Sequence, residues 1–175
     1  PDRAFLGCSG LDGSVSIRSG VKEIGEQAFY GCNGIRLIEL SNRGLTTIGK
    51  QAFAFCTSVD SYLQIPKSVT SIGDEAFRGL RDLGIILGEI TFLGNEPVMG
   101  SNVFADAPGL HFVFRQGASG YSTPTWLGYP CRAIPNSLPV LDPIGQKTIM
   151  PGESIEIRLQ ATDADDADLV YSASN

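Results

Sequence analysis

Hydrophobic and polar positions repeat along this chain with a period of 24 residues. Apolar residues recur six, sixteen and nineteen positions after each Phe of the first three copies. The most regular element is an Ala-Phe pair, found at Ala4-Phe5, Ala28-Phe29, Ala52-Phe53 and Ala76-Phe77. Self-similarity at such a period is the sequence signature of a solenoid, in which stacked coils build one continuous core.

The third copy shows which elements one coil contains. Leu63 and Ile65 alternate with Tyr62 and Gln64, which predicts a short strand with one face inward. Turn-forming residues follow at 66–68. A Val-x-x-Ile-Gly segment and two polar residues then lead into Ala-Phe. We expect an exposed turn there, followed by a short helical or 3₁₀ segment that carries the Phe inward to a central spine.

The second copy departs from this pattern in a compensated way. In its strand, 36–40, the inward residues Ile38 and Leu40 come one position early, and the turn at 41–44 is one residue longer. A slip of one residue would exchange the two faces of a strand. The compensation therefore predicts that Ile38 and Leu40 still face the core.

These residues resemble a known family. The pattern Phe-x-x-Cys-x-x-Leu, then a strand, then Ile-Pro-x-Ser-Val-Thr-x-Ile-Gly-x-x-Ala-Phe, which ends at 65–77, is similar to the BspA-type leucine-rich repeat of bacterial and protist surface proteins. The resemblance implies a leucine-rich-repeat solenoid of short parallel strands, turns and short helical or 3₁₀ segments.

Three of the four cysteines occupy the same place in successive coils. Cys8, Cys32 and Cys56 each follow a spine Phe by three residues. We expect them to be buried small apolar residues, because free Cys is among the most buried residue types. Coils about 4.8 Å apart would also allow a disulfide sterically. Cys131 stands alone, and its state is not predicted.

The array is expected to end near residue 134. Val103-Phe104 replaces Ala-Phe, 27 residues after the preceding pair, and 111–114 has the pattern of a last strand. The segment 117–134 contains Tyr121, Trp126 and Tyr129. Terminal repeats must close the core against water, and aromatic side chains do this with few residues, so this segment is interpreted as a cap.

The period disappears after a linker at 135–139. Residues 140–175 resemble the opening strands of the cadherin-like and immunoglobulin-like modules of bacterial surface proteins. Such sandwiches need about 100 residues and seven strands, so this module is incomplete. The sequence therefore predicts a solenoid with its cap over 1–134 and a partial all-β sandwich module over 140–175.

An acidic cluster in this second segment is a candidate calcium site. Asp163, Asp165 and Asp168 supply the carboxylate oxygens that calcium prefers. The corresponding loop in cadherin-like modules often reads Asp-Pro-Asp-Gly-Asp, and Ala164, Asp166 and Ala167 depart from that pattern. The alternative is a solvated acidic loop between strands.

Composition excludes several classes of function. The net charge is −6 and there is no basic stripe, which argues against nucleic-acid binding. No apolar run is long enough to span a membrane, so any membrane contact would come through other parts of a parent protein. The single histidine, His111, has no readable catalytic partner, and nucleophile and phosphate-loop motifs are absent. The sequence therefore indicates a non-catalytic protein.

The outward positions of the predicted strands are the candidate binding face. They are Ser16, Arg18, Arg36, Glu39, Tyr62 and Gln64. Solenoid sheet faces are common binding surfaces, although these side chains could equally serve only to solvate the sheet. We expect an extracellular or cell-surface adhesion module for a protein or glycan ligand, and the resemblance implies extracellular-matrix or host-protein partners. The alternatives are a structural spacer and an accessory region of a large secreted enzyme.

Overall fold

The computed structural model describes residues 1–41, 43–80, 88–135, 140–141 and 161–162. The chain forms two compact units, Pro1–Ile134 and Pro135–Asn175. In the second unit, the described strands are β12 (Val140–Leu141) and β13 (Ala161–Thr162), which pair antiparallel. The predicted all-β sandwich module otherwise lies outside the described residues.

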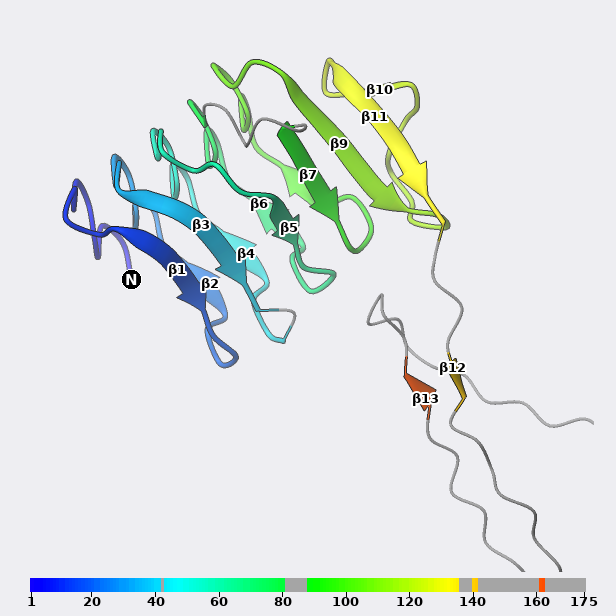
Figure 1. Cartoon of the computed structure of the whole chain (residues 1–175), viewed down its shortest axis with the longest axis horizontal. Coiled ribbons are helices and arrows are strands. Elements are labelled where there is room, and N and C mark those ends of the chain that lie inside the picture. Colours follow the sequence, from blue (N-terminus) through cyan, green and yellow to red (C-terminus); the bar gives the residue numbers. More distant parts are fainter. Residues whose placement is uncertain (42, 81–87, 136–139, 142–160, 163–175) are drawn as a thin grey trace, which may run out of the picture. The chain divides into compact units, whose positions relative to one another are not determined.

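The first unit is a solenoid of parallel strands (Figure 1). One side carries β1 (Gly13–Ile17), β3 (Ile35–Leu40), β5 (Leu63–Ile65), β7 (Gly88–Phe92) and β9 (Leu110–Arg115). A second side carries the short strands β2 (Glu23–Ile24), β4 (Thr47–Ile48), β6 (Ser71–Ile72) and β8 (Val98–Met99). Successive short strands pair in parallel, whereas the longer strands fall into a β1–β3 ladder and a separate ladder that begins at β5. The predicted solenoid is confirmed.

Strand register confirms the compensated slip in the second copy. Val15 pairs with Ile38, 23 residues along, and a bulge lies between Gly13 and Ser14. The short strands return to the 24-residue offset, with Glu23 opposite Thr47. Ile38 is buried, and Leu40, which is partly buried, packs against the core as predicted.

The phenylalanine spine runs through five coils. Phe5, Phe29, Phe53, Phe77 and Phe104 stack face to face, with ring centroids 5.1–5.6 Å apart and planes within 12° of parallel. The central rings are buried, and burying a Phe side chain stabilises the fold by roughly 1.5–3 kcal/mol. The spine therefore provides a continuous apolar contact between neighbouring coils.

Glycine after each short strand has a steric reason. A Cβ atom on Gly73 would lie 2.6 Å from the backbone nitrogen of Lys50, and one on Gly100 would lie 2.4 Å from that of Asp74. Neighbouring coils thus approach too closely at this position for any side chain. Gly100 follows β8, so Met99-Gly100 takes the place of the Ile-Gly motif in the fourth coil.

The segment that carries Ala-Phe is a series of turns, and the predicted helix or 3₁₀ segment is absent from the described residues. The residue before each pair has a left-handed φ of 53–56°, as at Gln27, Gln51 and Glu75. This conformation directs alternate amides to different partners: the Phe29 amide donates to Ala52 of the next coil, whereas the Tyr30 amide donates locally to Gln27. Backbone bonds that a helix would keep internal instead join neighbouring coils. We call these stacked segments the turn stack.

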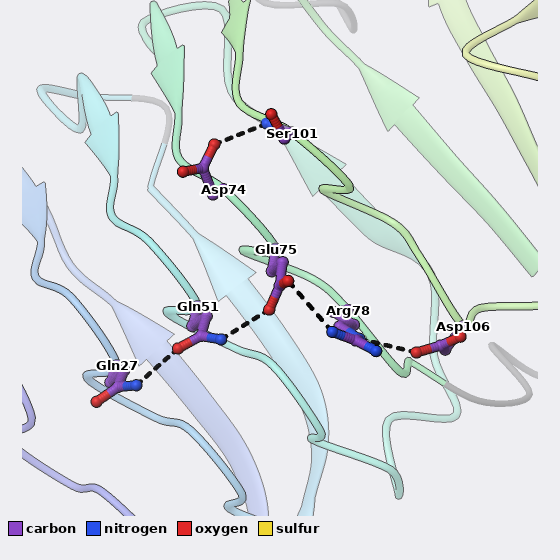
Figure 2. Close-up of polar contacts among 7 residues, drawn as sticks. All are labelled: Gln27, Gln51, Asp74, Glu75, Arg78, Ser101 and Asp106. Carbon is purple, nitrogen blue, oxygen red and sulfur yellow. Dashed lines mark hydrogen bonds and ion pairs between the residues drawn. The ribbon is translucent and has the colours of Figure 1, made fainter.

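Side chains at the left-handed positions form a polar ladder across the coils (Figure 2). Gln27 Nε2 donates to Gln51 Oε1 at 2.6 Å, and Gln51 Nε2 donates to Glu75 Oε2 at 2.7 Å. Arg78 continues the ladder, because its Nη1 lies 3.2 Å from Glu75 Oε1 and its Nε lies 2.8 Å from Asp106 Oδ2. The ladder therefore links the turns of neighbouring coils through side-chain bonds.

The C-terminal cap adds strands that the sequence did not predict. β11 (Tyr129–Ile134) pairs in parallel with β9, and β10 (Thr125–Trp126) pairs antiparallel with β11 (Figure 1). The strand predicted at 111–114 is thus confirmed as β9, but the prediction that it is the last strand was wrong. Cys131 lies opposite Phe112, which places it in the core, and the antiparallel turn then ends the ladder.

The predicted aromatic residues do close the core. Trp126 packs edge-on against Phe92 and Phe112, with centroids 5.1 Å from each. Its Nε1 donates to Glu96 Oε1 at 3.0 Å, and the Tyr129 hydroxyl donates to the Phe104 carbonyl at 2.7 Å. The polar atoms of these rings are thus satisfied at the edge of the core, as buried Tyr and Trp require.

Candidate binding face

All six predicted face residues are exposed on the outer side of the longer strands. Ser16 lies on β1, Glu39 lies opposite it on β3, and Gln64 lies on β5. Alternation of inward and outward side chains accounts for Ser16 and Gln64, whereas Arg36 lies at the register shift between β1 and β3. The prediction of exposure is confirmed, while the binding role stays a prediction.

Some of these side chains pair with each other or with neighbours. Ser16 Oγ donates to Glu39 Oε2 across the β1–β3 ladder. Arg36 Nη2 donates to Asp60 Oδ2, which joins the second coil to the third. Exposed ion pairs of this kind contribute about 0–1 kcal/mol, so they orient the side chains more than they stabilise the fold.

Arg18 and Tyr62 differ from these paired residues. Among the residues that the structure describes, neither side chain has a hydrogen-bond or ion-pair partner. Tyr62 is 67% exposed, which is unusual for a large aromatic side chain. An unpaired guanidinium and an exposed ring are the groups most often found at the energetic centre of protein interfaces.

The structure adds three residues to this face that the sequence did not indicate. Arg132 Nη2 on β11 lies 2.9 Å from Glu89 Oε2 on β7, so the pair spans β9 between them. His111 lies on β9, and its Nδ1 is 3.0 Å from the Gly109 carbonyl oxygen. His111 and Arg132 also line a small hollow of about 110 Å³ with Pro124 of the cap. Predicting this group required the parallel pairing of β11, which the period does not reveal.

The candidate calcium ligands Asp163, Asp165 and Asp168 lie outside the described residues. Within the described part of the chain, no group of three or more His, Cys, Asp or Glu side chains is arranged to hold a metal ion. Calcium binding by the acidic cluster therefore stays a prediction. The described residues also contain no helix long and apolar enough to cross a membrane.

The cysteine prediction was correct for two of three positions. Cys32 and Cys56 are buried, whereas Cys8 is exposed, because in this structure no coil covers the outer side of the first one. All four cysteines are free. Burial raises the pKa of the Cys56 thiol to about 12, with a smaller contribution from Cys32. The thiols of Cys32 and Cys56 each donate to the carbonyl of a spine residue, Cys32 to Phe5 at 2.9 Å and Cys56 to Phe29 at 3.1 Å.

Short parallel strands, a phenylalanine spine and an exposed strand face define a repeat solenoid of the leucine-rich class. The family model described as "BspA type Leucine rich repeat region (6 copies)" matches residues 1–113, and the chain belongs to this family. The family assignment inferred from the repeat motif is thus confirmed for the solenoid.

Comparison with solved structures agrees with this assignment. A leucine-rich repeat protein from Bacteroides ovatus is 26% identical to this chain, with a TM-score of 0.50 over 73% of the chain. The chain spans about a third (31%) of the length of that protein. No curated protein matches the sequence.

Proposed function

We propose that the solenoid is a non-catalytic adhesion module of an extracellular or cell-surface protein, and that the outer face of its longer strands binds a protein ligand. Leucine-rich repeat proteins are generally protein-binding modules, which supports the proposal that this solenoid binds a protein. The proposal that this face binds the ligand rests on Tyr62, which is exposed and has no hydrogen-bond partner among the described residues.

The face has the chemistry of a protein interface. Two ion pairs, Arg36 with Asp60 and Arg132 with Glu89, supply positively charged hydrogen-bond donors and negatively charged acceptors. A partner can exchange these exposed pairs for intermolecular ones at little cost. Arg18 and Tyr62 supply the unpaired cation and the aromatic surface that form hot spots. Extracellular-matrix and host proteins are the partner class that we propose.

Attachment of the chain to an immobilised extracellular matrix tests the proposal. We expect Tyr62→Ala and Arg18→Glu each to weaken binding about tenfold or more, because hot-spot truncation typically costs at least that factor. Lys50→Glu is the matched control for the charge reversal, since Lys50 is exposed at the start of a turn-stack segment, away from the strand face. The control should bind as the unmodified chain does.

Two results would contradict the proposal. Attachment that survives both face substitutions would favour a spacer, which tolerates such changes. Attachment lost equally in Lys50→Glu would indicate a diffuse charge effect. Thermal unfolding of every variant establishes that the fold is intact, and we expect small changes because all three side chains are exposed.

A further inference from the structure

The turn stack ends at a notch where, within the described part of the chain, alternate backbone amides have no acceptor. In each coil, alternate turn amides donate to the next coil: Glu75 to Ser101 and Phe77 to Val103, both at 2.9 Å, and Gly79 to Ala105 at 2.8 Å. The equivalent amides of the last turn belong to Asn102, Phe104 and Asp106. Among the described residues, these three amides have no acceptor.

The short-strand side ends in the same way. The amides of Gly73 and Gly100 donate to Ile48 and Ile72 of the preceding coil, at 2.8 and 2.7 Å. Met99 is the residue of β8 equivalent to Ile48 and Ile72. Its carbonyl is therefore expected to point away from β6, toward the position that a further coil would occupy. β8 is the last strand of its sheet in the described structure. An edge that offers an acceptor followed by alternating donors is a template for another extended chain.

This edge borders a hollow of about 210 Å³. Gly100 and residues 102–105 form its floor, and Leu127 and Tyr129 of the cap form its wall. The wall is fixed by the bond from the Tyr129 hydroxyl to the Phe104 carbonyl. Leu127 is 48% exposed here, and Val98 on β8 is 75% exposed, so apolar surface lies beside the unpaired backbone. We call this feature the terminal notch.

The shape of the notch selects its occupant. On the longer-strand side, β11 and β10 continue the ladder beyond β9, whereas on the turn side no described element follows 102–106 (Figure 1). The end of the solenoid is therefore a step and not a flat surface. The first coil of a second copy, which presents strand and turn together, would meet β11 and β10 before it reached the turn. A single extended segment has no such obstacle.

We propose that the terminal notch binds an extended peptide segment of a partner protein. The segment lies beside 98–106, its carbonyls accept the amides of Asn102, Phe104 and Asp106, and one of its amides donates to the Met99 carbonyl. An apolar side chain of the peptide covers Leu127. Main-chain hydrogen bonds supply affinity and the apolar contact supplies selectivity, as in other cases of strand addition. This proposal does not depend on the strand face being a binding surface.

The sharpest test uses a peptide that already has the required shape. Residues 98–106 are the segment that accepts these bonds from the fourth coil, so the probe is acetyl-Val-Met-Gly-Ser-Asn-Val-Ala-Ala-Asp-amide. Ala replaces the copy of Phe104, because Phe112 and Tyr129 already occupy the space beyond that ring. Amide resonances of the ¹⁵N-labelled full chain are followed by NMR as the peptide is added.

We expect saturable shifts at Asn102, Phe104 and Asp106, and hydrogen exchange at these amides slowed about tenfold or more. Leu127→Glu should weaken binding about tenfold, while Tyr62→Ala on the strand face should leave it unchanged. Replacing the peptide's copy of Gly100 by Pro removes the donor to Met99 and should weaken binding about fivefold. Leu127 is half exposed, so its variant should fold, and thermal unfolding checks this.

Three outcomes would overturn the proposal. The first is no shift at the three amides up to about 5 mM peptide, which is the weakest affinity a useful recognition site would show. The second is a change in amide chemical shifts that is confined to β1 and β3. The third is protection of the same amides by self-association of the chain alone, measured by sedimentation, because the occupant would then be a second copy.

Discussion

The side-chain amide of Gln51 donates a hydrogen bond to the carboxylate of Glu75, 24 residues further along the chain, over 2.7 Å. Both residues have a left-handed backbone, with φ of 53° and 54°. Their position is thus costly for the backbone and favourable for the side chain. Replacing Gln51 can separate the two effects.

Gln51→Ala should destabilise the protein by about 2 kcal/mol, because it removes two partly buried hydrogen bonds and retains the strained backbone. Gln51→Gly removes the same bonds but relieves the strain, so it should be about 1 kcal/mol less destabilising. Urea denaturation of the three proteins measures both values. Equal stability of the two variants would show that the left-handed φ costs nothing here.

Gly73→Ala should destabilise the solenoid by about 1–3 kcal/mol, the usual cost of overpacking. The added Cβ would lie 2.6 Å from Lys50 N, and a backbone atom cannot move aside as a flexible side chain can. Gly10→Ala is the matched control, because no atom lies within 4 Å of its Cβ position. Its unfolding temperature should change little, and a similar loss in both variants would refute the steric explanation.

The stability of the protein should fall between pH 9 and about pH 12 as unfolded Cys56 ionises. Its folded pKa is raised from 9.0 to about 12, chiefly by burial, so the contribution is complete below pH 9 and is lost as the pH rises. The slope for one group is at most about 1.4 kcal/mol per pH unit. The free energy of unfolding, measured by urea denaturation at several pH values across this range, should depend less on pH in Cys56→Ala than in the unmodified protein. An identical pH dependence would contradict the effect of burial.

Cys8 should be the first cysteine to react with a thiol reagent in the native protein. It is exposed, whereas Cys32, Cys56 and Cys131 are buried. Labelling followed by mass spectrometry should show one fast thiol, which Cys8→Ser removes. The other three should react at the rate of local or global unfolding, which is slower by orders of magnitude. Rapid labelling of Cys32 in the native state would show that the first coil opens.

The sequence predicted the features that depend on hydrophobic period and missed those that depend on backbone conformation. The stacking of Phe29 on Phe53 follows directly from the 24-residue repeat. The shifted pairing of Val15 with Ile38 follows from the apolar residues that come one position early in the second copy. The left-handed turns were missed because Gln27 and Gln51 occupy positions where Gly or Asn would have signalled a positive φ.

The C-terminal end of the candidate face was missed for a different reason. Arg132 reaches Glu89 only because β11 returns in parallel to β9, and nothing in 117–134 repeats the earlier pattern. Exposure of Cys8 likewise depends on which coils are present and not on its own surroundings in sequence. The local sequence pattern thus predicts the repeating unit, whereas the two ends depend on strand pairing between segments that do not share the pattern.

The inter-coil hydrogen bonds of the turn stack all point in one direction, and this gives the turn stack an electrical polarity. From Arg3 to Gly79, each inter-coil amide in the turns donates towards the following coil. Peptide dipoles aligned in this way add, as they do along an α-helix. Partial positive charge therefore accumulates at Asn102 and Phe104, and partial negative charge at the carbonyls of the first coil. A peptide that ends in a carboxylate should consequently be favoured over its amidated form, by a margin that salt reduces.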